Sequence, residues 1–145
     1  MPVSPKRHAA QVPSAKAHVC DVSDQSQVDS TMALVEREMG APSVLIHNAA
    51  GGAWGTFMEV DPPTLNRNFQ VNTMGLLYLA RRLAPTMVTA GQGAIIVTGN
   101  TSARRGRANF AGFAPTKAAN AFSPKRWRGT WAPRACTSPT LSSMQ

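Results

Sequence analysis

The residues with the clearest chemical potential surround position 113, where Phe113 precedes Lys117 by one turn of a predicted helix. Asn72, inside another predicted helix, and the polar residues 100–102, after an apolar run, add amide and hydroxyl groups. Amides donate hydrogen bonds, and hydroxyls both donate and accept them. Phe113 has no hydroxyl, and its ring cannot give or take a proton.

The first predicted elements precede residue 41. Residues 15–24 predict a short strand that ends at Asp21 and leads into a turn. Ser23 or Asp24 is expected to cap the helix that follows, whose apolar residues recur at helical spacing. Gly40 supplies the expected stop of that helix.

Two later apolar runs, residues 43–52 and 93–102, do not alternate with polar residues, which favours parallel strands covered on both faces. Residues 62–91 predict one long helix, and another follows Phe113 with Pro115 in its first turn. The order of strands and helices indicates an α/β fold with a parallel sheet. In such folds, ligands bind beside the carboxyl ends of the strands.

The composition of the 145-residue chain, with 43% hydrophobic residues, is that of a globular protein. No apolar run is long enough to span a membrane, and the N-terminus lacks the apolar core of a secretory signal. Two cysteines, Cys20 and Cys136, give no disulfide framework, so a cytoplasmic location is expected. The three histidines show no metal-ligand spacing, and no metal is expected.

Charge is distributed unevenly along the chain. Residues 1–100 carry seven Lys/Arg and seven Asp/Glu, whereas residues 101–145 carry eight Lys/Arg and no acid. From Ser123 the sequence follows neither a strand nor a helix period and is rich in Pro, Arg, Ser and Thr. We therefore expect an irregular N-terminal segment, one domain and a basic, disordered tail, at residues 1–14, 15–122 and 123–145.

Five motifs within residues 15–122 occur in the order and spacing of the short-chain dehydrogenase/reductase family: CDVSD, LIHNAAGG, VNTMG, GAIIVTG and Phe-x-x-x-Lys. This resemblance implies a Rossmann-like, doubly wound parallel sheet, here partial because the first βα unit is absent. It also implies NAD or NADP as the cofactor and hydride transfer to or from a carbonyl or alcohol substrate. The helix at 62–91 corresponds to the helix that forms dimers in the family.

The resemblance assigns roles to individual residues. Asp21, followed by Val22, resembles the acid that hydrogen-bonds the adenine ring. Lys117 resembles the lysine that holds the nicotinamide ribose, and Asn72 resembles the asparagine that anchors a proton-relay water. The plain alternatives are a solvated helix lysine and a tolerated surface asparagine.

A further part of the cofactor site is implied for the loop after the second predicted strand. Asn48, Ala49, Ala50 and Gly51 resemble the segment that passes close to the adenosine ribose. His47 and Ala50 depart from its pattern. Ala50 would hinder a backbone that needs glycine, unless Gly51 and Gly52 relieve this by a one-residue shift.

Two catalytic positions depart from the family. Phe113 stands where the family has the tyrosine that exchanges a proton with the substrate oxygen, and Asn100 stands where it has a serine. Thr101 or Ser102 would replace that serine if the loop shifts. The stretch VTGNTSARRGRANFAGFAPTK resembles a branch of the family that naturally carries phenylalanine, so Phe113 is expected to be inherited.

The family's phosphate-binding turn, Gly-x-x-x-Gly-x-Gly, does not occur in the sequence. The resemblance therefore implies truncation at the N-terminus, which would leave an exposed sheet edge and an uncovered apolar face. After about residue 122 we expect a shifted reading frame, because codons for residues 124–144 are compatible with a family-like helix, turn and strand in another frame. A natural disordered tail is the alternative.

Three functions stay open at this point. The first is an NAD(P)-dependent oxidoreductase, impaired in this chain. The second is a non-catalytic partner of full-length relatives, associating through the leucines of helix 62–91, in which case the chain would be found only with such a partner. The third, least favoured, is nucleic-acid binding through RRGR and PKRWRG with Trp127 stacking, which would weaken steeply with salt. The leucines in question are Leu76, Leu77, Leu79 and Leu83.

Overall fold

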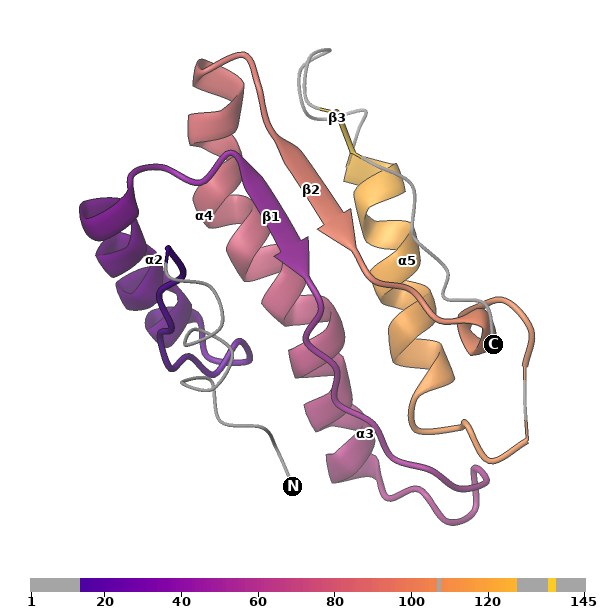
Figure 1. Cartoon of the computed structure of the whole chain (residues 1–145). Coiled ribbons are helices and arrows are strands. Elements are labelled where there is room, and N and C mark those ends of the chain that lie inside the picture. The colour runs from indigo at the N-terminus through magenta and orange to yellow at the C-terminus, as the bar shows by residue number, and fades with distance from the viewer. Residues whose placement is uncertain (1–13, 107, 128–135, 138–145) are drawn as a thin grey trace.

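The structure, a computed structural model, describes residues 14–106, 108–127 and 136–137. Its parallel sheet has three strands in the order β1 (Val44–His47), β2 (Ala94–Val97) and β3 (Cys136–Thr137). β1 and β2 pair along their whole length, so they end side by side (Figure 1). The loops that follow these two strands therefore begin at the same edge of the sheet.

Helix α2 (Gln25–Met39) begins and ends where its sequence predicts. The side chain of Asp24 accepts hydrogen bonds from the backbone N–H groups of Ser26 and Gln27, which confirms the predicted N-cap. Gly40 follows the last turn with a φ of 84°, a left-handed conformation that glycine adopts without steric cost. These caps provide partners for backbone groups that a helix end leaves unpaired.

The long helix predicted over residues 62–91 is present, but a π-helical turn interrupts it. It consists of α3 (Pro62–Phe69), the π turn η1 (Gln70–Met74) and α4 (Gly75–Thr89). Asp61 caps its start by accepting a hydrogen bond from the backbone N–H of Thr64 at 2.9 Å. Single π turns are frequent at functional sites, because they change the direction of side chains along a helix.

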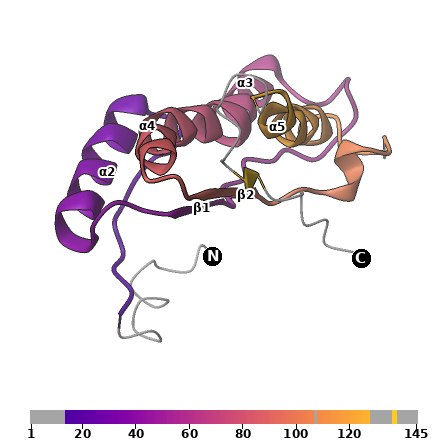
Figure 2. The ribbon, with the colours of Figure 1, turned by 90° about the horizontal axis from the view of Figure 1, so that it is seen from above.

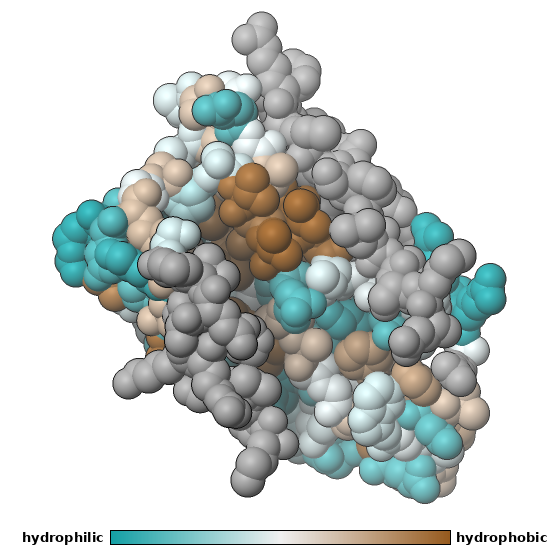
Figure 3. Space-filling view, in the orientation of Figure 1, coloured by the Kyte–Doolittle hydropathy of each residue, from teal (hydrophilic) through white to brown (hydrophobic). Residues whose placement is uncertain are grey.

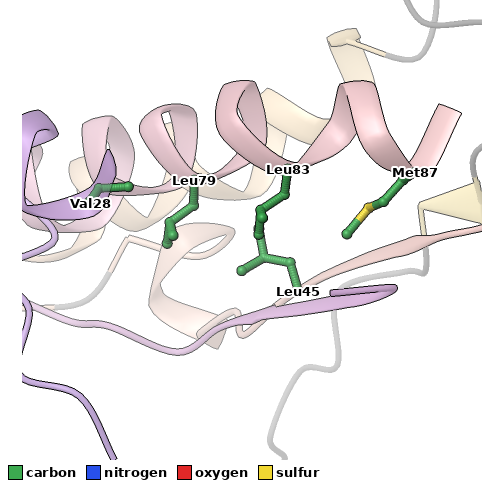
Figure 4. Packing of buried hydrophobic residues seen from close by; sticks show 5 residues of the cluster. All are labelled: Val28, Leu45, Leu79, Leu83 and Met87. Atoms are coloured by element: carbon green, nitrogen blue, oxygen red, sulfur yellow. The ribbon is translucent and has the colours of Figure 1, made fainter. Parts of the chain in front are cut away.

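The core lies between α4 and β1. Leu79, Leu83 and Met87 project from α4, Leu45 meets them from β1, and Val28 of α2 completes the cluster (Figure 4). Burial of these apolar side chains holds the three elements together. An ion pair between Arg82 of α4 and Glu36 of α2 reinforces the contact between the two helices.

The sequence suggested that the leucines of α4 supply an apolar surface for a partner. The structure does not place them on such a surface. Leu76, Leu79 and Leu83 are buried inside the chain, and Leu77 is half-buried. The helical period turns the three buried leucines toward the protein's own core. The expectation that all four supply an exposed interface is therefore wrong for three of them.

Residues 15–21 do not form the predicted strand. A strand exists through hydrogen bonds to a neighbouring strand, and within the described ranges no strand pairs with this segment. Val19 is accordingly exposed. The segment nevertheless leads into a close contact, because a Cβ atom added at Gly75 of α4 would lie 2.9 Å from the Val22 carbonyl oxygen.

One face of the sheet has no described helix on it. Helices α4 and α5 (Ala114–Trp127) lie on the same side of β1 and β2 (Figure 2). On the opposite side Val44 and Ile46 are 51% and 62% exposed, and an apolar patch marks the centre of this face (Figure 3). The prediction of a strand covered on both faces is therefore wrong for β1, while the predicted uncovered apolar face is present.

Helix α5 contains Pro115 in its first turn, as predicted, where a missing N–H leaves no intrahelical hydrogen bond unmade. The helix continues into the segment 123–145, for which an irregular tail was expected, and β3 is the other described part of that segment. The rest of that segment lies outside the described residues, and so do residues 1–13. The expected nucleic-acid motif PKRWRG is described only as far as Trp127. Across the described ranges, no helix is long and apolar enough to cross a membrane.

Candidate functional site

Asn72 is the centre of a hydrogen-bonded junction at the carboxyl end of β1, and its side chain is fully buried. Its Oδ1 accepts from the Gly51 N–H at 2.8 Å, and its Nδ2 donates to the Gly51 carbonyl and to Thr116 Oγ1, both at 2.8 Å. Thr116 Oγ1 donates in turn to the Phe113 carbonyl at 2.8 Å. This network explains an asparagine inside a helix. Because the amide is bonded to protein groups, its role with a relay water stays a prediction.

Two more side chains from the same helix bind the start of α5. Asn68 donates from Nδ2 to the Gly112 carbonyl at 2.9 Å, and Thr73 Oγ1 donates to the Thr116 carbonyl at 3.3 Å. Both side chains are buried. Sequence reasoning does not find Asn68 or Thr116. The available signal was that Asn68 precedes Asn72 by four residues, which places both amides on one face of the helix.

Lys117 lies beside this junction and is only 3% exposed, which excludes a solvated helix lysine. Its Nζ donates to the Ala49 carbonyl at 3.4 Å and lies 5.9 Å from the centroid of the Phe113 ring. Burial lowers the pKa of Lys117 from its ordinary value, because the charged form loses hydration. An ammonium has three N–H donors, and Ala49 is the one acceptor for them among the described residues. Donor capacity is therefore left for the hydroxyls of a ligand.

His47, the last residue of β1, is buried on the helix-facing side of the sheet. Burial and the charge of Lys117 lower the pKa of His47 to about 4, while a hydrogen bond with the Asn72 backbone opposes the shift. Its Nε2 has no hydrogen-bond partner in the described part of the chain. The imidazole is therefore neutral at pH 7. In the same part of the chain, no three His, Cys, Asp or Glu side chains come together as a metal site would require.

Among the three polar residues after β2, Asn100 and Ser102 bond to each other. Asn100 caps the short helix η2 (Thr101–Ala103), and its Oδ1 accepts from the Ser102 N–H at 2.9 Å and from Ser102 Oγ at 2.7 Å. Ser102 is buried, whereas Thr101 is exposed. Because the Ser102 hydroxyl already donates to Asn100, a serine-like role for it stays a prediction.

Asp21 and Val22 precede α2, at the end of the segment that was expected to be a strand. Asp21 Oδ1 accepts from the Ser23 hydroxyl at 2.6 Å and from the Ser23 N–H at 3.0 Å. These hydrogen bonds from Ser23 lower the pKa of Asp21, so the carboxylate is charged at neutral pH. It is exposed and available as an acceptor, and its contact with an adenine ring stays a prediction.

The loop after β1 has its tightest position at Gly51. Asn48 and Ala50 are exposed, whereas a Cβ atom added at Gly51 would lie 2.8 Å from Oδ1 and 3.3 Å from Cα of Asn68. The position that requires glycine is thus one residue after Ala50, as the one-residue shift predicts.

The ring of Phe113 meets two other aromatic rings, and sequence reasoning finds neither of those two. The centroid of the Trp54 ring lies 4.7 Å from that of Phe110, edge-on at 76°, and 5.5 Å from that of Phe113. Phe110 and Phe113 are 6.4 Å apart. We call Trp54, Phe110 and Phe113 the aromatic cluster. No local pattern connects Trp54 to Phe110, because they lie on different loops.

Backbone hydrogen bonds join the two loops that carry the cluster. The Gly55 N–H donates to the Asn109 carbonyl at 2.9 Å, and the Ala111 N–H donates to the Gly55 carbonyl at 3.2 Å. These bonds form a parallel bridge between Gly55 and Phe110. The bridge places the loop after β1 against the loop before α5, next to Lys117.

Comparison with known sequences assigns the chain to a group of enzymes. The family model described as Enoyl-(Acyl carrier protein) reductase matches residues 4–136. The sorbitol dehydrogenase of Cereibacter sphaeroides is 31% identical over 113 residues, which are 77% of this chain and 44% of that protein. The chain therefore spans less than half the length of this relative.

Solved structures agree in fold. A short-chain dehydrogenase from Streptomyces avermitilis superposes with a TM-score of 0.83 at 27% identity, covering 91% of this chain and 49% of that one. A gluconate 5-dehydrogenase from Burkholderia cenocepacia J2315, in complex with NADP and tartrate, gives 0.83 at 24% identity and covers 95% and 54%. The chain belongs to the short-chain dehydrogenase/reductase family and has part of its Rossmann-type α/β fold.

Proposed function

We propose that this chain carries the lysine-bearing part of the site of an NAD(P)-dependent oxidoreductase, which transfers hydride between the cofactor and a carbonyl or alcohol substrate. The observation that carries the proposal is Lys117. It is buried, it is fixed 3.4 Å from the Ala49 carbonyl, and among the described residues no other acceptor uses its N–H donors. The names of the relatives support the reaction class, and the NADP complex of one relative supports the cofactor.

The residues present fit a nicotinamide cofactor at Lys117. When bound, such a cofactor supplies or accepts the hydride. The free N–H donors of Lys117 would hydrogen-bond the ribose hydroxyls, and Asn72 and Thr116 hold the start of α5 so that the ammonium stays in place. Asp21 and Val22 on the adenine side, with the loop 48–51 on the ribose side, complete the proposed contacts.

The proton that accompanies hydride transfer has no donor at position 113. Phe113 cannot supply it, and the Ser102 hydroxyl is already bonded to Asn100. The amide of Asn100 can donate a hydrogen bond to a substrate oxygen but cannot relay a proton as a hydroxyl does. Loss of a positioned general acid costs about 10²–10⁴-fold in rate. We therefore expect the chain to be impaired, with solvent as the proton source.

Cofactor binding tests the proposal directly. Lys117→Met removes the ammonium and keeps a similar length, so NAD⁺ and NADP⁺ should bind the variant about tenfold more weakly than the parent chain in saturation-transfer NMR titrations. Lys16→Met is the matched control, because Lys16 is half-exposed and pairs with Glu38 at 2.9 Å, far from the junction. Equal binding by the parent and the Lys117 variant, or no binding of either cofactor by the parent, would overturn the proposal.

Turnover in the same preparations gives the second readout. The parent chain should show no NAD(P)H oxidation with carbonyl substrates, and Phe113→Tyr alone should not restore it. A tyrosine hydroxyl would return the proton donor, but the sequence contains no glycine-rich turn to bind the cofactor phosphates. Measurable turnover by the parent chain would contradict the impairment.

No observation in the described residues favours the other two functions. Three of the four leucines required for a partner interface are buried in the core. Of the residues expected to bind nucleic acid, Arg107, Arg128 and Gly129 lie outside the described ranges, and Trp127 is the last residue of α5.

A further inference from the structure

The aromatic cluster has a buried side and an open side. Phe113 is buried, and the Lys117 ammonium lies 5.9 Å from the centroid of its ring. Trp54 contacts both phenylalanines but is still 66% exposed. An indole held against two rings and left open to solvent exposes a large apolar surface at a fixed position, which is unfavourable unless something binds there.

The cluster is held in place by backbone rather than by chance packing. Gly55 bridges to Phe110, so the two loops cannot move independently. A Cβ atom added at Gly112 would lie 2.8 Å from the Ala53 carbonyl oxygen, and one added at Gly52 would lie 3.3 Å from the Phe113 ring. Small residues therefore let the loops approach closely enough for the rings to meet. Such preorganisation lowers the entropic cost of binding a ligand.

The loop that carries Trp54 offers few hydrogen-bonding side chains. Residues 51–58 contain one hydroxyl, that of Thr56, and this hydroxyl bonds to Glu59 Oε2 at 3.0 Å. Phe57 and Met58 are the next exposed side chains along the loop. A polyol bound here would lose hydrogen bonds to water without replacing them, at a cost for each unpaired group. This surface is therefore unsuited to a sugar alcohol.

The positive charge of Lys117 beside the cluster further restricts the class of ligand that can bind there. Aromatic clusters often bind cations over their ring faces. Here the ammonium of Lys117 is already positioned at the Phe113 ring, and it would repel a second cation. The rings of Trp54 and Phe110 meet edge-on, so the exposed indole can pair with another ring in an offset or edge-on arrangement.

We propose that the aromatic cluster is the substrate-binding surface of this chain, and that its substrates are flat, ring-bearing ketones or alcohols without a positive charge that stack on Trp54. That the bound ligand is a substrate rests on the proposed oxidoreductase function. The binding surface itself is independent of the cofactor. A ring on Trp54 would lie next to Phe113 and therefore close to Lys117, where the reaction is proposed to occur.

Calorimetric titration without cofactor tests the surface. β-Tetralone should bind the full chain more tightly than methyl octyl ketone, which has the same number of carbons and no ring, and sorbitol should not bind. Trp54→Leu should weaken β-tetralone binding about fivefold, as expected for the loss of one aromatic pair, whereas Trp54→Phe should keep most of it. Phe57→Leu is the matched control, because Phe57 is exposed on the same loop but belongs to none of the ring pairs of the described residues.

Two additions keep the test decisive if Trp54→Leu does not fold. In the unmutated chain labelled with fluorotryptophan, the fluorine resonance that Trp54→Phe removes should shift on addition of β-tetralone. Ile46→Thr on the uncovered sheet face should leave binding unchanged. Equal affinity for the two ketones, an unshifted Trp54 resonance, or loss of binding in Ile46→Thr would each overturn the proposal. Ketone binding without any NAD(P) binding would keep the surface and reject the oxidoreductase.

Discussion

His47 shows how a single buried residue can make this protein sensitive to acid. Its imidazole is 2% exposed, and no described group accepts or donates at Nε2. Protonation would place a second positive charge near Lys117 in a buried site. The neutral form is therefore part of the folded state, whereas the unfolded chain protonates the same side chain freely.

The free energy of unfolding should rise with pH between about 4 and 6.5. His47 has a pKa of about 4 in the folded protein against a reference value of 6.5, so the unfolded state binds more protons in this window. The contribution of neutral His47 to the free energy of unfolding is fully present above pH 6.5. It decreases by up to about 3 kcal/mol as the pH falls toward 4. Urea denaturation of the parent chain and of His47→Asn at several pH values measures it.

The His47→Asn variant should have a flatter profile across this window. Carboxylates with lowered pKa values, such as Asp24 at about 2, lose their contribution at more acidic pH and do not mask the effect. Parallel pH profiles for the two proteins would show that His47 does not titrate in the way its burial implies.

At the scale of residues, the Phe-x-x-x-Lys motif identifies some site residues but not the side chains that surround them. The spacing of Phe113 and Lys117 could be found in the sequence, and burial in the structure distinguishes a site lysine from a solvated one. Trp54 could not be found, because its role depends on a bridge to a loop far along the chain. Asn68 lies between these cases, with a helical spacing that was available as a signal.

At the scale of elements, the close approach of the β1 loop to α3 fixes the geometry around Asn72. Gly51→Ala should destabilise the protein by about 1–3 kcal/mol, because the new Cβ atom would lie 2.8 Å from Asn68 Oδ1 and push against its backbone. Gly106→Ala is the control, since nothing lies within 4 Å of a Cβ atom there. Chemical denaturation of both variants measures the difference, and equal midpoints would refute a tight contact at Gly51.

Elements that depend on local signals were predictable from the sequence, and elements that depend on distant partners were not. Asp24 and Gly40 mark the ends of α2 through hydrogen bonds and conformations within a few residues. The strand expected at residues 15–21 needs a neighbouring strand, and the described sheet provides none beside it. The π turn η1 has no sequence signal of comparable strength, although it positions Asn72.

At the scale of the whole molecule, the uncovered sheet face should make the chain associate with itself or bind apolar dyes. Val44 and Ile46 present apolar side chains on a face with no described helix, next to the edge of β1 that pairs with no described strand. Ile46→Thr keeps a β-branched residue and should lower the average mass in sedimentation velocity experiments. Val88→Thr, an exposed position on α4, serves as the control. Identical sedimentation of the parent chain and Ile46→Thr would exclude this face as the cause.

The bridge between Gly55 and Phe110 also bears on the order of events during folding. Closing it brings together two loops with α3, α4 and β2 between them in sequence, so its entropic cost is met only after those elements have docked. Within the core, the contact between Leu45 of β1 and Leu83 of α4 spans a shorter stretch of chain than the bridge does. The aromatic cluster is therefore a late structure in folding and an early loss in local unfolding, and ligand recognition at Trp54 reports that both loops have reached their native positions.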